Sequence, residues 1–578
     1  MNIGVHVTHE VFHKIGGIGP IIHGLCTSDI YKAVFEKTAL YGPLFSSSAG
    51  VFSRLGKGGE VLYSNHDNYD CDNYHSIFLD IIKEYNIDIV YGKRNLVNEF
   101  SINKKNTIDI ILVGINKMNV DKVNLFKHKL WEKFTIESNR YSELDYEQYL
   151  RIGIPYLDII RKLYPGDATF YHFSHEYMGI PSVLSVLISD CNRKRNKTIY
   201  YAHAISPCRY VTESLPGHDI TFYNTMHKNI SEGKSFEEEY GMQYSSYRTE
   251  LVKRSSNFDR IFTVSDLVKD EYQYLIPGVD ENKLKIVYNG IPLKYISREE
   301  KLKSRNRLQT YISNLYNFIP DIIFTHVTRL VPSKGIWRDI SLLYILDELF
   351  HKTGIKGAYI LLSTLVGTGR EASQISSMAQ EYGWPIIHRE GWPDLVGAES
   401  DTYSYLSHFN SRSKNIKGVF INQFGFDRRN CGEKVPEEAD FLDLRIGSDV
   451  EFGFSIYEPF GKAQLEVLPF GGIPAVSPSC GCSYLLKKRF QDLVHKPFAV
   501  IDFIGGIKNY LKDADLSSIS IEYRFELEKK LLVKAGKEIF MSLPKNDSER
   551  LHALDSIQEK FQCLGWEKVA SSMNFSDL

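Results

Sequence analysis

Cysteine is scarce in this sequence, and its spacing excludes a familiar type of metal site. The eight cysteines among 578 residues stand at positions 26, 71, 191, 208, 431, 480, 482 and 563. They show no paired zinc spacing, and Cys480-Gly-Cys482 is too close for the usual Cys-x-x-Cys chemistry. A reducing cytoplasm is the compartment that this pattern favours.

Long apolar runs are also missing. No stretch approaches the roughly 18 apolar residues that would span a bilayer. The first residues lack a basic region, and Asn2 to Val7 already has the pattern of a strand, so we expect no signal peptide. Peripheral contact with a membrane stays open.

The chain has no excess charge of either sign. Lys and Arg number 69 and Asp and Glu number 71, so no global field would recruit nucleic acid or an anionic membrane. Any cationic site must therefore be local. The Asp-x-Asp at Asp70 to Asp72 follows no apolar strand and is interpreted as a surface loop, so no metal site is predicted there.

Hydrophobic and aromatic residues are plentiful, at 43% and 13%, which is typical of a soluble globular protein. Repeated alternation of strand and helix patterns predicts two large α/β units. We expect the first unit over 1–292, a charged hinge over 293–316, the second unit over 317–550 and a closing helix over 551–578. Strands of the second unit are predicted near Asp321, Tyr359, Pro385, Gly418, Val450 and Pro474.

Two carboxylates, Glu458 and Glu466, bracket the most informative segment. A short helix beginning near Gly461 would point its first backbone N–H groups, including that of Lys462, and its positive dipole end at an anion. Glu466 would lie about 7 Å further along the axis at ~1.5 Å per residue. A nucleoside diphosphate has this layout. The alternative is a helix that carries carboxylates in its first turn only because the dipole favours them.

Two cations follow a predicted strand upstream. Residues 321–328 have the pattern of a buried strand and 337–350 that of a helix, which places Arg329 and Lys334 where open α/β sheets bind ligands. Arg provides forked hydrogen bonds and Lys a point charge, and together they can neutralise a diphosphate. A solvated basic turn is the alternative.

A glycine-rich loop lies near the N-terminus, with Lys14, Gly16, Gly17 and Gly19 before a helix expected to begin near Pro20. Glycines let a backbone approach a ligand closely. A dinucleotide-binding fingerprint would place its glycines directly after the strand, whereas five or more residues intervene here, so NAD is a poor interpretation. A purely structural glycine turn remains an alternative.

These three segments resemble motifs of retaining GT-B glycosyltransferases, the group that includes glycogen and starch synthases. The resemblance extends over nearly the whole chain and implies two Rossmann-like domains facing a cleft, with the C-terminal helix crossing back to the N-terminal domain. It also implies that Glu458 faces the donor sugar, that Glu466 holds the ribose, and that the glycine loop lines the donor phosphates. The group usually has Asp where this chain has Pro20, which puts the role of that carboxylate in doubt.

Softer matches follow in the same order. Tyr200-Tyr201-Ala202-His203 resembles the site of a histidine that faces the donor sugar, and Phe173 to Tyr177, with His175, resembles a second strand end of that group. Gly367-Thr368-Gly369 resembles a Gly-Asp-Gly turn, with Thr in place of Asp. A histidine that is only structural is the alternative at both histidine positions.

The function expected from this resemblance is transfer of a sugar, such as a hexose, from a UDP-, ADP- or GDP-sugar to a glycan or another hydroxyl acceptor, without a metal or other cofactor. The residues expected to act on the reacting sugar and diphosphate are Glu458, His203, Arg329 and Lys334. Rival interpretations are a GT-B-fold epimerase or phosphorylase, or an inactive carbohydrate-binding protein. The long segment 393–448 is a candidate for acceptor recognition.

Overall fold

The computed structural model describes residues 1–11, 17–45, 50–56, 58–189, 192–241, 246–366, 373, 377, 381, 395–423, 425–493, 496–504 and 519–575. The chain forms two compact units. Unit 1 comprises residues 1–209, 229–292 and 565–578, and unit 2 comprises residues 210–228 and 293–564.

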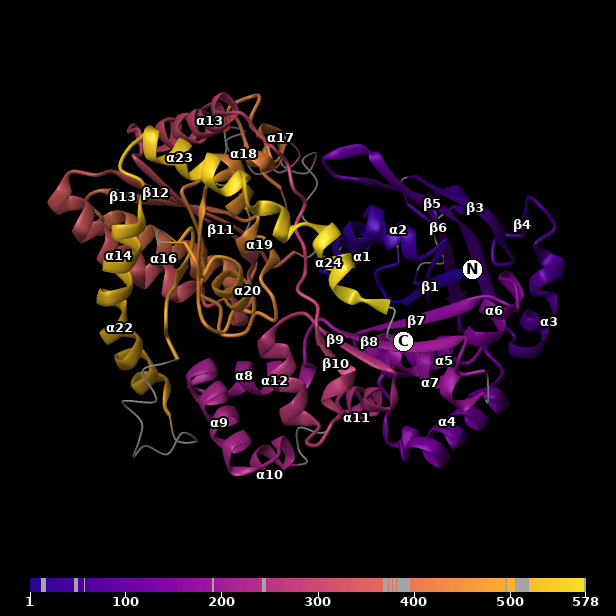
Figure 1. Cartoon of the computed structure of the whole chain (residues 1–578). Helices are drawn as coiled ribbons and strands as arrows, with labels where there is room; N and C mark the ends of the chain where they lie inside the picture. Colours follow the sequence, from indigo (N-terminus) through magenta and orange to yellow (C-terminus); the bar gives the residue numbers. More distant parts are fainter. Residues whose placement is uncertain are drawn as a thin grey trace. The chain divides into compact units, whose positions relative to one another are not determined.

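Unit 1 is built on a mostly parallel sheet, shown in indigo and magenta in Figure 1. In spatial order its described strands are β10 (Leu284–Ile286), β9 (Arg260–Thr263), β8 (Asn196–Ala202), β7 (Thr169–His175), β1 (Asn2–Val7), β2 (Lys37–Pro43), β6 (Ser101–Gly114), β5 (Asp88–Asn98), β3 (Gly59–Ser64) and β4 (Tyr69–Asp70). From β10 to β6 neighbouring strands run parallel, whereas β5, β3 and β4 pair antiparallel. The carboxyl ends of β1, β7 and β8 therefore meet at one edge of the sheet.

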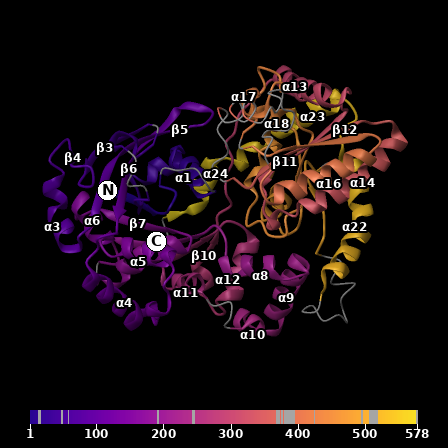
Figure 2. The ribbon, with the colours of Figure 1, turned by 180° about the vertical axis from the view of Figure 1, so that it is seen from behind.

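The helices of unit 1 include one from the C-terminal end of the chain. They are α1 (Ile18–Cys26), α2 (Asp29–Val34), α3 (His75–Tyr85), α4 (Val120–Phe134), α5 (Leu144–Gly153), α6 (Tyr156–Leu163), α7 (Ile180–Ile188), α10 (Phe236–Tyr240), α11 (Tyr247–Arg254), α12 (Asp266–Leu275) and α24 (Trp566–Met573). Figure 2 shows α24 beside α1. Trp566 packs so closely on Gly24 that a Cβ atom there would clash with the indole, and Glu567 accepts the backbone N–H groups of Asp29 and Ile30 at 3.1 Å.

Unit 2 has a parallel sheet with helices on both faces. Its described strands, in spatial order, are β13 (Ile416–Ile421), β12 (Gly357–Thr364), β11 (Ile322–Arg329), β14 (Val450–Gly453), β15 (Ile473–Val476) and β16 (Ala499–Val500). Its helices are α13 (Arg298–Tyr316), α14 (Ile336–Thr353), α16 (Ala398–Arg412), α17 (Arg428–Cys431), α18 (Phe441–Gly447), α19 (Lys462–Leu465), α20 (Cys482–Arg489), α22 (Ile521–Ser542) and α23 (Asp547–Gln558).

Alternate residues of β11 feed two separate cores in unit 2. Phe324 packs with apolar residues of α14, α16 and α22, whereas Ile323 packs with those of α13 and α18. Such alternation is the period of two that a strand covered on both faces requires. The predicted α/β class with two parallel-sheet units is confirmed.

The units differ in detail from the predicted domain ranges. Both divide the chain after Pro292, but residues 210–228 belong to unit 2, as do 551–564. The segment predicted as an exposed hinge contains α13, whose Leu308 and Tyr311 are buried in unit 2. Charge patterning suggested exposure there, yet the buried Arg305 of this helix is neutralised by Asp449 at 2.7 Å. The strand predicted near Pro385 and the turn 367–369 lie outside the described residues.

Candidate functional site

The loop after β11 carries the two predicted cations. Arg329 is the last residue of β11, is exposed, and has no side-chain partner among the described residues. Lys334 lies in the short 3-10 helix η7 (Pro332–Lys334). The next residue, Gly335, has φ 62°, and a Cβ atom there would clash with the carbonyl oxygen of Phe454, so the tight approach of this loop to the segment after β14 requires glycine.

Lys334 and Glu458 form an ion pair, with side chains only 12% and 17% exposed. They come from the carboxyl ends of β11 and β14, which are neighbours in the sheet. The structure thus joins the predicted cation motif to the predicted carboxylate motif. The motifs predicted that Lys334 binds a diphosphate and that Glu458 faces a sugar. In this structure the two side chains neutralise each other.

The backbone around Glu458 is fixed by the loop after β15. The N–H of Glu458 donates to Ser479 O at 3.1 Å, and the N–H of Gly481 donates to Glu458 O at 2.9 Å. Gly461 has φ 88°, and a Cβ atom there would clash with the Cys480 sulfur. Burial raises the pKa of the Cys480 thiol well above its usual value, and its neighbour Cys482 adds to this effect.

Glu466 lies at the end of α19 and is bound by two cations. Arg445 Nη2 is 2.9 Å from Glu466 Oε2, and Lys462 Nζ is 3.5 Å from Oε1. Arg445 is nearly buried and also contacts the buried Glu451 at 3.2 Å. Sequence reasoning missed Arg445, which comes from α18 in the segment 393–448 that was considered only for acceptor recognition. Because α19 has only four residues, its dipole is weak, and the cations are the stronger attraction for an anion.

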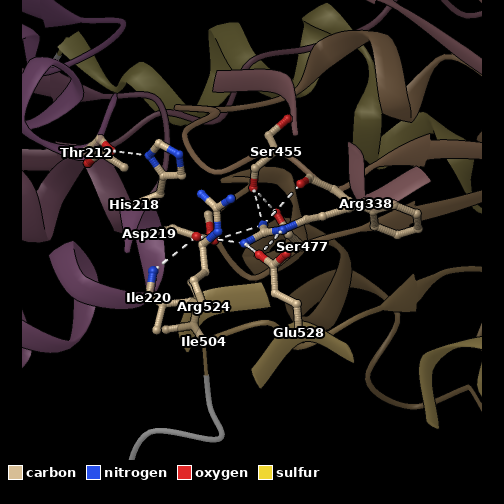
Figure 3. Close-up of polar contacts among 12 residues, drawn as sticks. Thr212, His218, Asp219, Ile220, Arg338, Ser455, Ser477, Ile504, Arg524 and Glu528 are labelled. Atoms are coloured by element: carbon tan, nitrogen blue, oxygen red, sulfur yellow. Dashed lines mark hydrogen bonds and ion pairs between the residues drawn. The ribbon is translucent and has the colours of Figure 1, made fainter. Parts of the chain in front are cut away.

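A buried charge cluster supports the loop beside Glu458 (Figure 3). Arg338, on α14, binds Asp219 at 2.8 and 3.0 Å and Glu528 at 2.7 and 2.9 Å, and all three side chains are buried. Asp219 also accepts a hydrogen bond from Ser479 Oγ at 2.7 Å. Since the carbonyl of Ser479 holds the Glu458 N–H, the cluster connects three helices, α9 (His218–Glu232), α14 and α22, to the Glu458 backbone.

In unit 1, His203 follows β8 and belongs to a row of histidines. Its Nε2 is 2.8 Å from Nδ1 of His175, at the end of β7, and Nε2 of His175 is 2.8 Å from Nδ1 of His6 in β1. The rings of His175 and His203 are stacked with centroids 5.2 Å apart. The structure therefore brings both histidines of the softer matches together, and adds His6, which sequence reasoning missed.

The pairing register of the strands is what brings His6 next to the other two histidines. His6 is paired with Phe173, and His175 with Tyr201, along parallel strands. Residues two apart on a strand face the same side, so His6, His175 and His203 share one face of the sheet. Strand pairing decides this, and it is not visible in any one segment.

Glu176 holds the turn that carries His203. Its backbone has φ 57°, which is rare for a residue other than glycine, and its Oε1 accepts the N–H of Ala204 at 2.5 Å. Burial raises the pKa of Glu176 to about 8, against the opposing effect of N–H donors from Ala204 and His203. Backbone strain of this kind gathers at functional sites.

The predicted glycine loop is described in part. Lys14 and Gly16 lie outside the described residues. Gly17 precedes α1, and Gly19 is inside that helix, where its N–H donates to Glu10 Oε2 at 2.8 Å. The buried Glu10 therefore accepts the Gly19 N–H in this structure, and the role of the glycine loop in lining the donor phosphates stays a prediction.

The described residues include neither a membrane-spanning helix nor a group of side chains that could hold a metal ion. No described helix is long and apolar enough to cross a membrane. Nor do three or more His, Cys, Asp or Glu residues of the described part gather in an arrangement that could hold a metal ion.

Comparisons with known proteins give structural likenesses only. No protein-family profile matches the chain, and no curated protein matches its sequence. Sucrose-phosphate synthase from Thermosynechococcus elongatus shares 12% identity at TM-score 0.49, covering 99% of this chain and 97% of that chain. A UDP-forming α,α-trehalose-phosphate synthase from Burkholderia xenovorans, solved with glucose-6-phosphate, shares 11% at 0.48, covering 99% and 98%.

The catalytic domain of starch synthase IV from Arabidopsis thaliana, bound to ADP and acarbose, shares 12% at TM-score 0.46, covering 96% of this chain and 99% of that chain.

Proposed function

We propose that the chain is a retaining glycosyltransferase that transfers a sugar from a nucleoside-diphosphate sugar to a hydroxyl acceptor. The observation that carries this proposal is the contact between Lys334 and Glu458, two residues 124 positions apart that were assigned to one site from separate motifs. Arg329 is the last residue of β11, and Glu466 ends the short helix that follows Glu458. Both segments follow the carboxyl ends of the neighbouring strands β11 and β14, where open α/β sheets bind ligands.

Donor binding would exchange the partners of this ion pair. A diphosphate offers Lys334 a stronger anion than one carboxylate, and Arg329 adds a forked donor. Glu458 is then released to face the sugar, where positive charge develops as the glycosidic bond breaks. The cations stabilise the charge of the departing diphosphate, which is the main electrostatic task of the reaction.

Glu466 would bind ribose hydroxyls rather than take part in bond cleavage. Arg445 and Lys462 hold its carboxylate in place, so its orientation does not depend on the ligand. A prearranged carboxylate loses little side-chain entropy on binding. His203, in unit 1, is proposed separately as a residue that contacts a sugar.

A panel of sugar nucleotides tests this function. The melting temperature of the protein is measured with UDP-, ADP- and GDP-sugars, and the donor that stabilises it is then assayed for transfer and hydrolysis. At about 100 times Kd a ligand stabilises by about 2.7 kcal/mol, which shifts the melting temperature by several degrees. The Lys334→Ala variant should lose most of this shift.

Each outcome separates the alternatives. No shift with any sugar nucleotide would refute the nucleotide site. A shift without transfer or hydrolysis would favour an inactive binding protein, and interconversion of free donors would favour an epimerase. Transfer should persist with excess chelator, because Arg329 and Lys334 supply the positive charge. Loss of transfer that magnesium or manganese restores would refute metal independence.

A further inference from the structure

An unbroken row of hydrogen bonds crosses the sheet of unit 1. Tyr31 Oη is 2.7 Å from His6 Nε2, His6 Nδ1 is 2.8 Å from His175 Nε2, and His175 Nδ1 is 2.8 Å from His203 Nε2. We call these four residues the histidine relay. Tyr31, His6 and His175 are fully buried. No ring nitrogen takes part in more than one hydrogen bond of the row.

The histidines of the relay are neutral at pH 7. Burial lowers the pKa of His6 and of His203 to about 3, and lowers that of His175 well below its ordinary value. Each bond between two of these rings joins imidazole to imidazole, with no carboxylate in between. A neutral imidazole has one N–H donor and one acceptor nitrogen, so the direction of one bond in the relay fixes the direction of the others.

Tyr31 determines which direction is favoured. A phenol is a better donor than a neutral imidazole, and an imidazole nitrogen is a better acceptor than a phenol oxygen. Thr38 Oγ1 lies 3.4 Å from Tyr31 Oη, placed to donate to that oxygen. With Tyr31 donating to His6 Nε2, His6 donates to His175, and His175 donates to His203 Nε2. The remaining proton of His203 is then on Nδ1.

His203 Nδ1 is where the relay ends. This atom is buried and has no hydrogen-bond partner in the described part of the chain. Most buried polar atoms are bonded, so an unpaired one calls for an explanation. A ligand oxygen would supply the missing acceptor.

We propose that Tyr31, acting through His6 and His175, sets the tautomer of His203 so that it presents an Nδ1–H donor to an oxygen of a sugar ligand. The sugar as ligand rests on the proposed function, whereas the tautomer does not. Tyr31, His6 and His175 are positioning residues, since they act through His203. No net charge moves along the row.

Nitrogen NMR of ¹⁵N-histidine-labelled, ligand-free protein at neutral pH tests the tautomer directly. The His203 signals are assigned by their loss in His203→Asn. We expect His203 to be protonated on Nδ1 and unprotonated on Nε2 in the wild type. In Tyr31→Phe the fixed direction is lost, and the Nε2-protonated form of His203 should become detectable.

Tyr156→Phe is the matched control, because it removes another buried tyrosine, bonded to His172 Nδ1 at 2.7 Å, from outside the relay. It should change the signals of His172 and leave those of His203 as in the wild type. A wild-type His203 protonated on Nε2, or His203 signals unchanged in Tyr31→Phe, would overturn the proposal. The first of these outcomes does not depend on whether Tyr31→Phe folds.

Kinetics give a second measurement once a donor is known. Tyr31→Phe should lower kcat/KM for transfer about tenfold or more, as loss of a directed donor to a reacting group does, and Tyr156→Phe should leave it nearly unchanged. An equal decrease of kcat/KM in both variants would mean that the relay supports the fold and does not orient His203 for transfer. If no sugar nucleotide binds, the proposed function is wrong. The NMR measurement on ligand-free protein still tests the tautomer of His203.

Discussion

Arg329 and Lys334, which we propose bind the same diphosphate, differ in their surroundings. Arg329 is exposed, with no partner in the described structure, whereas Lys334 is bound to Glu458. We predict that replacing either residue with Ala lowers turnover at least tenfold, the scale on which lost transition-state donors act. Arg329→Ala should leave the unfolding curve unchanged. Lys334→Ala should lower stability slightly, because it leaves Glu458 partly buried without its cation.

Steady-state kinetics and urea unfolding measure these two effects. Lys352→Ala, at the exposed end of α14, is the control and should change neither. Wild-type turnover in both site variants would remove the proposed phosphate role of this loop.

The two carboxylates should fail in different ways when changed to Gln. In the proposed function Glu458 faces the sugar whose glycosidic bond breaks, so Glu458→Gln should lower kcat with little change in donor Kd. Glu466 is held by Arg445 and would bind ribose equally in ground and transition states, so Glu466→Gln should weaken donor binding more than it slows chemistry. A binding titration beside the kinetics separates the two. The reverse pattern would mean that the nucleotide lies the other way along α19.

At the scale of elements, the Arg338 cluster connects α9, α14 and α22 within unit 2 (Figure 3). Arg338→Met would leave Asp219 and Glu528 buried without their cation, and breaking a buried pair in this way costs about 3–5 kcal/mol. We expect a large loss of stability in urea unfolding. Since Ser479 binds both Asp219 and Glu458, kcat should also fall in any variant that still folds.

An exposed ion pair provides the comparison. Arg298 and Asp555 are also bonded, with side chains 65% and 42% exposed, and such exposed pairs contribute little to stability because water screens their charges. Asp555→Asn should therefore leave the unfolding midpoint nearly unchanged. A similar loss in both variants would show that burial of the Arg338 cluster has no special effect.

At the scale of the whole molecule, the histidine relay should make the fold sensitive to acid. Burial lowers the pKa values of His6 and His203 from 6.5 to about 3. Between these pH values both histidines are protonated in the unfolded chain and neutral in the folded chain. Their contribution to stability is complete above about pH 6.5 and decreases as pH falls toward 3. The loss is about 1.4 kcal/mol per pH unit for each histidine.

Urea unfolding between neutral pH and about pH 5, with hydrogen exchange of peptides from β1 and β7, measures this dependence. His203→Asn should make the pH dependence shallower. His66→Asn is the control, because His66 is only partly buried and is paired with Asp88 at 3.0 Å, and the slope should not become shallower. A slope in His203→Asn equal to that of the wild type would contradict the prediction.

Local patterns in the sequence were sufficient for the elements and for several site positions. Alternating strand and helix periods predicted β11 and α14 to within a residue or a few at each end, and with them the places of Arg329 and Lys334. The short helix beginning near Gly461, after Glu458, was likewise predicted from the sequence. These features depend on residues close together in the chain, where periodicity and turn chemistry act.

The α/β class, the ends of many strands and the segments that carry charge could therefore be predicted from the sequence alone. Which polar side chains meet depends on the tertiary fold: Lys334 with Glu458, Glu466 with Arg445, and His203 with His175 and His6. The partners in each pairing come from different elements of the chain. Sheet order and register bring such residues within bonding distance, and both arise from packing of the whole unit rather than from any local pattern.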